Sequence, residues 1–199
     1  KLNGINISGA NSPTYVASLT GNYRASVVDA NGCTGSSNSI AVNIFAQPTV
    51  HLNGVDANFC ENEDSILLAG FPLGGVFSGL GIAASYFNPS KLNVGSYNIK
   101  YAYTDGNGCS DTVEKEVFIR SKPNITQLLG PTMVQPNQTY SYLISATNGS
   151  TYNWTATNGT VTTSSSNYAN VLWGTAGVGD LQIVELNSYS CSDTGSFFI

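Results

Sequence analysis

A five-residue phrase ending in cysteine occurs three times along this chain and constrains the fold more than any other feature. It reads Asp29-Ala-Asn-Gly-Cys33, then Asp105-Gly-Asn-Gly-Cys109, and in altered form Asn187-Ser-Tyr-Ser-Cys191. Successive copies are about 80 residues apart, which is a period of domain size, because a unit that long closes its own small core. Since Asn-Gly between alternating apolar runs is a strong hairpin signal, we expect an array of small β-domains, each with a cysteine in the same late hairpin.

The composition favours an all-β fold. Only 10% of the residues are charged, whereas 41% are hydrophobic, which is enough for packed cores. Asn, Ser, Thr and Gly take up the remainder, and these residues form turns and solvated β faces. No segment of useful length has the apolar spacing of an amphipathic helix.

Charge and residue counts exclude several functions. A net charge of −5 with 7 Lys and Arg argues against a nucleic-acid partner, which requires a basic stripe. No apolar run reaches the ~20 residues of a membrane span, so we expect no membrane insertion. With His51 as the single histidine and no nucleophile or paired-carboxylate pattern, we expect no catalytic residue, no enzymatic activity and no bound cofactor.

Two prolines divide the chain into three predicted domains. Pro48 and Pro123 each follow an alternating run and begin a new one, and these short joints predict a stiff, extended array. Residues 1–46 are too few for a closed sandwich of about seven strands, so we expect the C-terminal part of a truncated domain. Residues 47–121 form a complete module, and residues 122–199 form another.

Alternating apolar runs predict strands in all three domains. They are Thr14–Leu19, Tyr23–Val28, Ile40–Phe45, Thr49–Val55, Ser65–Ala69, Gly75–Phe77, Ser96–Thr104, Val113–Arg120, Tyr140–Ser145, Tyr152–Thr157, Tyr168–Trp173, Leu181–Leu186 and Thr194–Ile199. Tyr152 and Trp154 lie on one face of their strand, as in a buried sandwich strand. Tyrosines that alternate in this way form either a core face or an exposed platform for stacking sugars, and both readings stay open.

The cysteines predict one disulfide. Cys60 lies just before a strand of the second domain and Cys109 in its late hairpin, so we expect a Cys60–Cys109 bond, which closes a loop of about 50 residues and contributes roughly 4 kcal/mol. In the third domain Gln135 stands where the second has Cys60, so Cys191 is expected to have no partner, and Cys33 to have lost its own. Disulfide use indicates an oxidising, extracellular setting.

Motifs spread over essentially the whole chain carry a resemblance to a known family. They are Gly21-Asn-Tyr23 through Cys33, Cys60-Glu61 with Gly74–Gly81 and Tyr101–Cys109, and Tyr152-Asn-Trp154 with Val171–Gly174. They resemble the immunoglobulin-like and PKD-like repeats of giant Bacteroidota cell-surface adhesins, including gliding-motility adhesins of the SprB type. The resemblance implies tandem immunoglobulin-like and PKD-like β-sandwich modules. It departs from the family at Gln135 and at Ser190, where a glycine usually precedes the last cysteine.

The resemblance implies a function at the cell surface. The chain is expected to be a structural repeat segment, a stalk or spacer, of a secreted adhesin filament exported by the type IX secretion system and involved in cell adhesion or gliding motility. Its partners would be neighbouring repeats of the same polypeptide, surface glycans, or the secretion and motility machinery. The alternatives are a carbohydrate- or protein-binding β-sandwich module, or an accessory tail of a secreted hydrolase.

Two of the repeated phrases resemble the opening of a calcium loop. Asp29 with Asn31, and Asp105 with Asn107, place oxygen ligands at alternate positions, as calcium requires. No glutamate follows at the spacing of a complete loop. A plain hairpin turn and a calcium site at a module joint both stay open.

Two short motifs resemble the acceptor sequence for O-glycosylation in exported Bacteroidota proteins, Asp followed by Ser or Thr and an aliphatic residue. They are Asp64-Ser65-Ile66 and Asp111-Thr112-Val113. The resemblance implies glycan attachment at Ser65 and Thr112.

Overall fold

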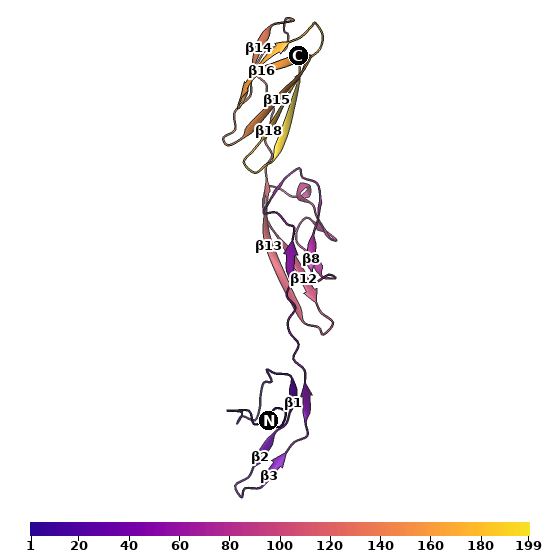
Figure 1. Ribbon diagram of the computed structural model, residues 1–199, viewed down its shortest axis with the longest axis vertical. Helices are drawn as coiled ribbons and strands as arrows, with labels where there is room; N and C mark the ends of the chain where they lie inside the picture. The colour runs from indigo at the N-terminus through magenta and orange to yellow at the C-terminus, as the bar shows by residue number, and fades with distance from the viewer. The chain divides into compact units, whose positions relative to one another are not determined.

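The computed structural model describes residues 1–199 and consists of β-strands with one short 3-10 helix, so the predicted all-β class is confirmed (Figure 1). The elements are β1 Gly21–Tyr23, β2 Ser26–Val28, β3 Thr34–Ser36, β4 Ile40–Val42, β5 His51–Asn53, β6 Asn58–Cys60, β7 Ile66–Leu67, β8 Ala69–Phe71, β9 Val76–Ser78, β10 Ile82–Ala83, β11 Tyr86–Phe87, η1 Pro89–Lys91, β12 Gly95–Thr104, β13 Ser110–Arg120, β14 Thr139–Leu143, β15 Thr151–Thr157, β16 Gly159–Ser165, β17 Tyr168–Trp173, β18 Asp180–Leu186 and β19 Ser192–Phe198.

The chain forms two compact units. The first unit combines Lys1–Thr49 with Thr104–Asp111, and the second combines Val50–Tyr103 with Thr112–Ile199. In the first unit β1 pairs with β4 and β2 with β3, and no residue among the first 49 is buried. The strand predicted at Thr14–Leu19 does not form, and Val16 within it is 89% exposed. Alternation alone does not make a strand where no neighbouring strand pairs with it.

In the second unit, the middle sandwich packs a four-stranded sheet against smaller sheets. The order β6-β13-β12-β9 forms the large sheet, and β10-β11-β7 and β5-β8 form the small ones. Phe59, Ile99, Val117 and Ile119 project from the large sheet into a core that Phe87 of β11 enters from the opposite side. The alternation of buried and exposed residues along β12 explains why its sequence predicted a strand.

The C-terminal sandwich consists of two three-stranded sheets, β14-β17-β16 and β15-β18-β19. Its core is formed by Tyr142, Ile144, Trp154, Ala169, Val171, Trp173, Leu181 and Ile183. Trp154 is buried and Tyr152 packs partly buried against the same core, so their predicted shared face is confirmed. The sequence did not predict β16, because its Thr- and Ser-rich residues mostly face solvent at the edge of a sheet and give no apolar signal.

The alternating tyrosines face the cores. Tyr101 is 2% exposed in the middle sandwich, and Tyr142 is fully buried in the C-terminal sandwich. The Tyr101 hydroxyl donates to the carbonyl of Pro72 and accepts from the N–H of Gly75 at 2.8 Å. The Tyr142 hydroxyl accepts a hydrogen bond from Trp173 Nε1 at 2.9 Å. These rings therefore pack the interior and do not form an exposed platform for sugars.

Candidate functional site

The recurring cysteine phrase folds into the same turn in all three copies. In each copy, Oδ1 of the first residue accepts backbone N–H bonds from the third and fifth residues at 2.8–3.0 Å. The first residue also donates its N–H to the cysteine carbonyl, and the fourth residue donates back to the first. The fourth residue has a positive φ, which is 84° at Gly32 and Gly108 and 66° at Ser190. The altered third copy therefore keeps the turn geometry with serine in place of glycine.

The cysteine of the third turn is covalently bonded to the middle sandwich. Cys191 forms a disulfide with Cys60, with their Cα atoms 5.5 Å apart and their positions 131 apart in sequence. Cys191 follows β18 of the C-terminal sandwich, and Cys60 ends β6 of the middle one. The expectation that Cys191 has no partner is wrong, because the partner lies in the preceding sandwich instead of at Gln135 in its own.

The predicted Cys60–Cys109 bond is also wrong, because the two cysteines lie at opposite ends of one strand. Cys60 is in register with Arg120, the last residue of β13, whereas Cys109 precedes its first residue, Ser110. A strand of that length spans more than about 30 Å, far beyond the Cα separation of a disulfide. Cys109 is half-buried and Cys33 is exposed, and both carry free thiols.

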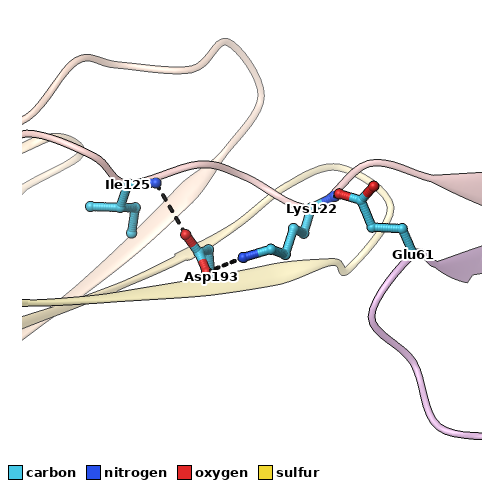
Figure 2. Close-up of polar contacts among 4 residues, drawn as sticks. All are labelled: Glu61, Lys122, Ile125 and Asp193. Carbon is cyan, nitrogen blue, oxygen red and sulfur yellow. Dashed lines mark hydrogen bonds and ion pairs between the residues drawn. The ribbon is translucent and has the colours of Figure 1, made fainter. Parts of the chain in front are cut away.

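Polar contacts reinforce the junction around the disulfide (Figure 2). Lys122 Nζ forms an ion pair with Asp193 Oδ1 at 2.6 Å, and the N–H of Ile125 donates to Asp193 Oδ2 at 3.1 Å. From the middle sandwich, Glu61 Oε1 accepts the backbone N–H of Lys122 at 3.0 Å. Lys122, directly before the buried Pro123, is thus held by carboxylates from both sandwiches, and Ile125, two residues after Pro123, is held by Asp193.

The electrostatic environment of Asp193 favours its charged form. Burial by itself raises the pKa of this carboxyl. The hydrogen bond from Lys122, the N–H of Ile125, the charge of Lys122 and the N–H of Thr194 together outweigh burial and hold the pKa of Asp193 below its ordinary value. The contact at the junction is therefore a charge-assisted one at neutral pH.

Arg120 at the end of β13 joins the middle sandwich to the third turn. Its guanidinium lies 4.6 Å from the ring centre of Phe118 and 4.2 Å from that of Tyr189, within the range of cation–π attraction. Arg120 Nε also donates to Asn58 Oδ1 at 2.6 Å. A further bond runs from Asn187 Nδ2 to the carbonyl of Ser121 at 2.9 Å. The turn is thus fixed by aromatic, polar and covalent contacts at once.

An open cleft of about 460 Å³ lies beside the disulfide. Asn58, Asn62, Glu63 and Asp64 line it from the middle sandwich, and Tyr189 and Ser192 from the C-terminal one. Glu63 Oε2 accepts the N–H of Cys60 at 2.9 Å, which ties one of these carboxylates to the cysteine loop. Amide and carboxylate groups next to a tyrosine can bind the hydroxyl groups of a polar ligand.

The predicted calcium ligands lie in the first two turns. Asp29 Oδ1 accepts from the N–H groups of Asn31 and Cys33, and Asp105 Oδ1 accepts from those of Asn107 and Cys109. These bonds explain why the phrase forms a turn. No group of three or more His, Cys, Asp and Glu side chains gathers in the chain as a metal cluster would. Calcium at Asp29 with Asn31 or at Asp105 with Asn107 stays a prediction.

The other predicted residues lie on exposed surface. Ser65 precedes β7 and Thr112 lies on β13, and both are exposed. His51 is exposed on β5. Glycan attachment at Ser65 and Thr112 stays a prediction. The chain also contains no helix with the length and apolar character needed to span a membrane.

Sequence reasoning missed the junction itself. The ion pair of Lys122 with Asp193 and the placement of Arg120 against Tyr189 follow no spacing rule, because each joins residues about 70 positions apart. The one available signal was the third cysteine, whose turn resembles the other two. A cysteine repeated at the period of a domain is as compatible with a bond between domains as with one inside a domain.

No protein-family model matches the chain, and no curated protein matches it. Among solved structures, the chain is similar to SGBP-B of the Bacteroides ovatus mixed-linkage glucan utilization locus, solved in complex with a mixed-linkage heptasaccharide, at 18% identity and a TM-score of 0.28. That match covers 77% of this chain and 48% of SGBP-B, so this chain spans about half the length of SGBP-B. The fold assignment rests on the sheets described above.

Proposed function

We propose that this chain is a structural segment of an extracellular, cell-surface protein and that it carries mechanical tension along the polypeptide. The observation that supports this most is the disulfide between Cys60 and Cys191, which ties the middle sandwich to the C-terminal one. The fold of a single sandwich does not require a covalent bond to the neighbouring sandwich. A covalent bond across a module junction serves to keep modules together when they are pulled apart.

The position of the bond gives tension a short route. Force applied to the two ends of the chain passes from Cys60 to Cys191 through the sulfur atoms and bypasses residues 61–190. These residues hold most of both cores. Tension on the chain ends therefore does not pull on residues 61–190, and their unfolding would not lengthen the chain between the two cysteines.

The contacts around the bond resist bending and twisting at the joint. Asp193, Lys122 and Glu61 connect both sandwiches to the joint itself, and Arg120 packs against Tyr189. A disulfide alone permits rotation about its single bonds. Several directional contacts around it limit that rotation, as a spacer of defined geometry requires.

The wider setting follows from the family resemblance. We assign residues 47–121 and 122–199 to successive repeat modules and residues 1–46 to the module before them. The parent protein would be a secreted adhesin exported by the type IX secretion system, with neighbouring repeats as partners of this segment. Participation in gliding motility belongs to the same proposal.

Single-molecule pulling from the two termini tests the mechanical proposal. The variant Cys33→Ser with Cys109→Ser removes both free thiols and leaves Cys60–Cys191 as the single bond. We expect the fully stretched length to increase by roughly 450 Å when reductant is added, because about 130 residues are released. An equal stretched length with and without reductant would contradict the proposal.

The cleft beside Tyr189 supports a second candidate, binding of a surface glycan. Its amide and carboxylate lining suits sugar hydroxyls, and its volume of about 460 Å³ suits a short oligosaccharide. Titration with soluble glucan oligosaccharides, followed by calorimetry on the wild type and on Tyr189→Ala and Asn62→Ala, tests it. Binding that both substitutions weaken at least fivefold supports a glycan site, and absence of heat with every sugar rejects it.

A further inference from the structure

One run of the middle sandwich is apolar on both faces, although the protein covers only one of them. Residues 66–71 read Ile-Leu-Leu-Ala-Gly-Phe and include β7 and β8. Leu68 is buried in the core, whereas Leu67, Ala69 and Phe71 alternate with the inward residues and are exposed. Continuous apolar runs are typical of strands that are covered on both faces. The outer face of this run therefore lacks the cover that its sequence indicates.

Strand pairing extends this outer face across the neighbouring strands. Tyr86 of β11 lies opposite Leu67, and His51 of β5 lies opposite Phe71. Both partners are exposed on the same side of the sandwich as the residues they pair with. Seven exposed residues thus share one surface, here called the outer platform: His51, Asn53, Leu67, Ala69, Phe71, Ala83 and Tyr86.

The outer platform carries the two exposed benzene-type rings of the middle sandwich. Phe71 is 58% exposed and Tyr86 is 48% exposed, whereas the other Phe and Tyr rings of this sandwich are buried or half-buried. Because Tyr86 lies opposite Leu67, four positions before Phe71, the two rings leave the backbone at points about 14 Å apart. The Asn53 side chain lies opposite Ala69, midway along this distance. The surface therefore presents two rings with an amide group between them.

Charge and area decide which kind of partner fits the outer platform. None of its seven residues is Lys, Arg, Asp or Glu, although the whole chain has a net charge of −5, so the partner is expected to be uncharged. A side chain on a sheet face occupies about 6.8 Å by 4.8 Å, so seven cover roughly 230 Å². A standard protein–protein interface needs about 800 Å² from each partner. The area is too small for a second copy of the chain and suits a narrow ligand.

We propose that the outer platform binds a linear, neutral polysaccharide. The C–H groups on one face of a sugar ring are apolar and pack flat against an aromatic ring, which Phe71 and Tyr86 each supply. Sugar hydroxyls are donors and acceptors, and the Asn53 amide, the His51 imidazole and the Tyr86 hydroxyl can pair with them. This site is separate from the cleft beside Tyr189, and it does not depend on the mechanical role.

Affinity electrophoresis of the full chain tests the proposal. Native gels contain hydroxyethylcellulose, laminarin or galactomannan as neutral probes, and alginate as a charged one. We expect at least one neutral probe to retard the wild type, and Phe71→Ala and Tyr86→Ala each to weaken that binding about fivefold or more, because each removes a stacking ring. Tyr86→Phe keeps the ring and should stay within about twofold of the wild type. Thermal melts verify that all variants are folded.

The matched control is Met133→Ala, which removes a side chain that is 90% exposed outside the outer platform. It should bind as the wild type does. Failure of all three neutral probes to retard the wild type, retardation by alginate alone, or equal loss of binding in Met133→Ala and Phe71→Ala would each overturn the proposal.

Two further measurements separate the glycan from other occupants and other sites. Loss of binding in Tyr189→Ala with full binding in Phe71→Ala would place the glycan in the cleft, which overturns the outer platform and supports the second candidate function. A dimer in sedimentation velocity that Phe71→Ala abolishes would assign the surface to a second copy and also overturn the proposal. Single-molecule pulling uses no glycan, so the mechanical proposal stands or falls separately.

Discussion

Cys60 and Cys191 are 131 positions apart in the chain, yet their Cα atoms lie 5.5 Å apart across the junction of two sandwiches. The loop that their bond closes contains most of both hydrophobic cores. On a chain-entropy estimate, closing a loop of this length lowers the entropy of the unfolded state and raises its free energy by about 5 kcal/mol. The junction is therefore a source of stability for both sandwiches at once.

Substitution Cys191→Ser should destabilise both sandwiches. We expect the apparent free energy of unfolding to fall by about 2–5 kcal/mol, because the unfolded chain regains its loop entropy. Guanidinium unfolding followed by tryptophan fluorescence and far-UV circular dichroism measures the change. Cys33→Ser is the control, since it removes an exposed free thiol and should shift the midpoint little. Equal midpoints for the two variants would show that the bond does not stabilise the fold.

Substitution Asp193→Asn should weaken the junction by about 1–2 kcal/mol, because it removes the charge that pairs with Lys122. The pKa of Asp193 is depressed in the folded state, so its contribution is complete above the ordinary pKa of 3.8 and is lost as pH falls through the folded value. The variant should therefore lose less stability than the wild type between about pH 4 and pH 2. Thermal melts of the variant and the wild type across this pH range measure the difference in stability loss.

The matched control for Asp193 is Glu114→Gln. Glu114 forms an ion pair with Lys100 at 3.2 Å, but both side chains are more than 40% exposed. An exposed pair of this kind contributes little, so the control should change stability by less than about 0.5 kcal/mol. A pH dependence that is the same in both variants would contradict the role assigned to Asp193.

Substitution Gly70→Ala should disturb the packing of Tyr101. A Cβ at Gly70 would lie 2.4 Å from Cζ of the buried Tyr101 ring, so the ring or the strand must move. We expect a loss of about 1–3 kcal/mol in the free energy of unfolding. Gly106→Ala is the control, because a Cβ there meets no atom within 4 Å. Differential scanning calorimetry measures the thermal stability of both variants. An unchanged stability of the middle sandwich in Gly70→Ala would contradict the packing argument.

Substitution Tyr142→Phe should leave the buried Trp173 N–H without its acceptor, at a cost of about 1–3 kcal/mol. Burial raises the pKa of Tyr142 above 10.0, an effect that its hydrogen bond with Trp173 partly offsets and that Tyr140 adds to. Its contribution is complete below pH 10 and is lost as pH rises through the folded value. Tyr97→Phe is the control, because the Tyr97 hydroxyl bonds Asn93 at an exposed position. Chemical denaturation at pH 7 and pH 11 measures the free energy of unfolding of both variants and so distinguishes them.

Much of the C-terminal sandwich could be predicted from its sequence. The runs Tyr152–Thr157 and Tyr168–Trp173 alternate between apolar and polar residues, and both form strands close to the predicted bounds. The edge strand β16 could not be predicted, because its side chains mostly face solvent and carry no apolar pattern. In residues 1–46 the same pattern predicted one strand too many. Thr14–Leu19 alternates but has no neighbouring strand to pair with, and it forms no strand.

The sequence by itself determined the all-β class, the repeated turn and the face that Trp154 presents to the core, because each depends on the spacing of neighbouring residues. Only the tertiary structure decided which cysteine bonds which. The local phrase around Cys191 matches the one around Cys109, and what separates them is whether a second thiol lies within about 6 Å of Cα distance. That distance is set by how one sandwich meets the next at Pro123, which no local pattern encodes.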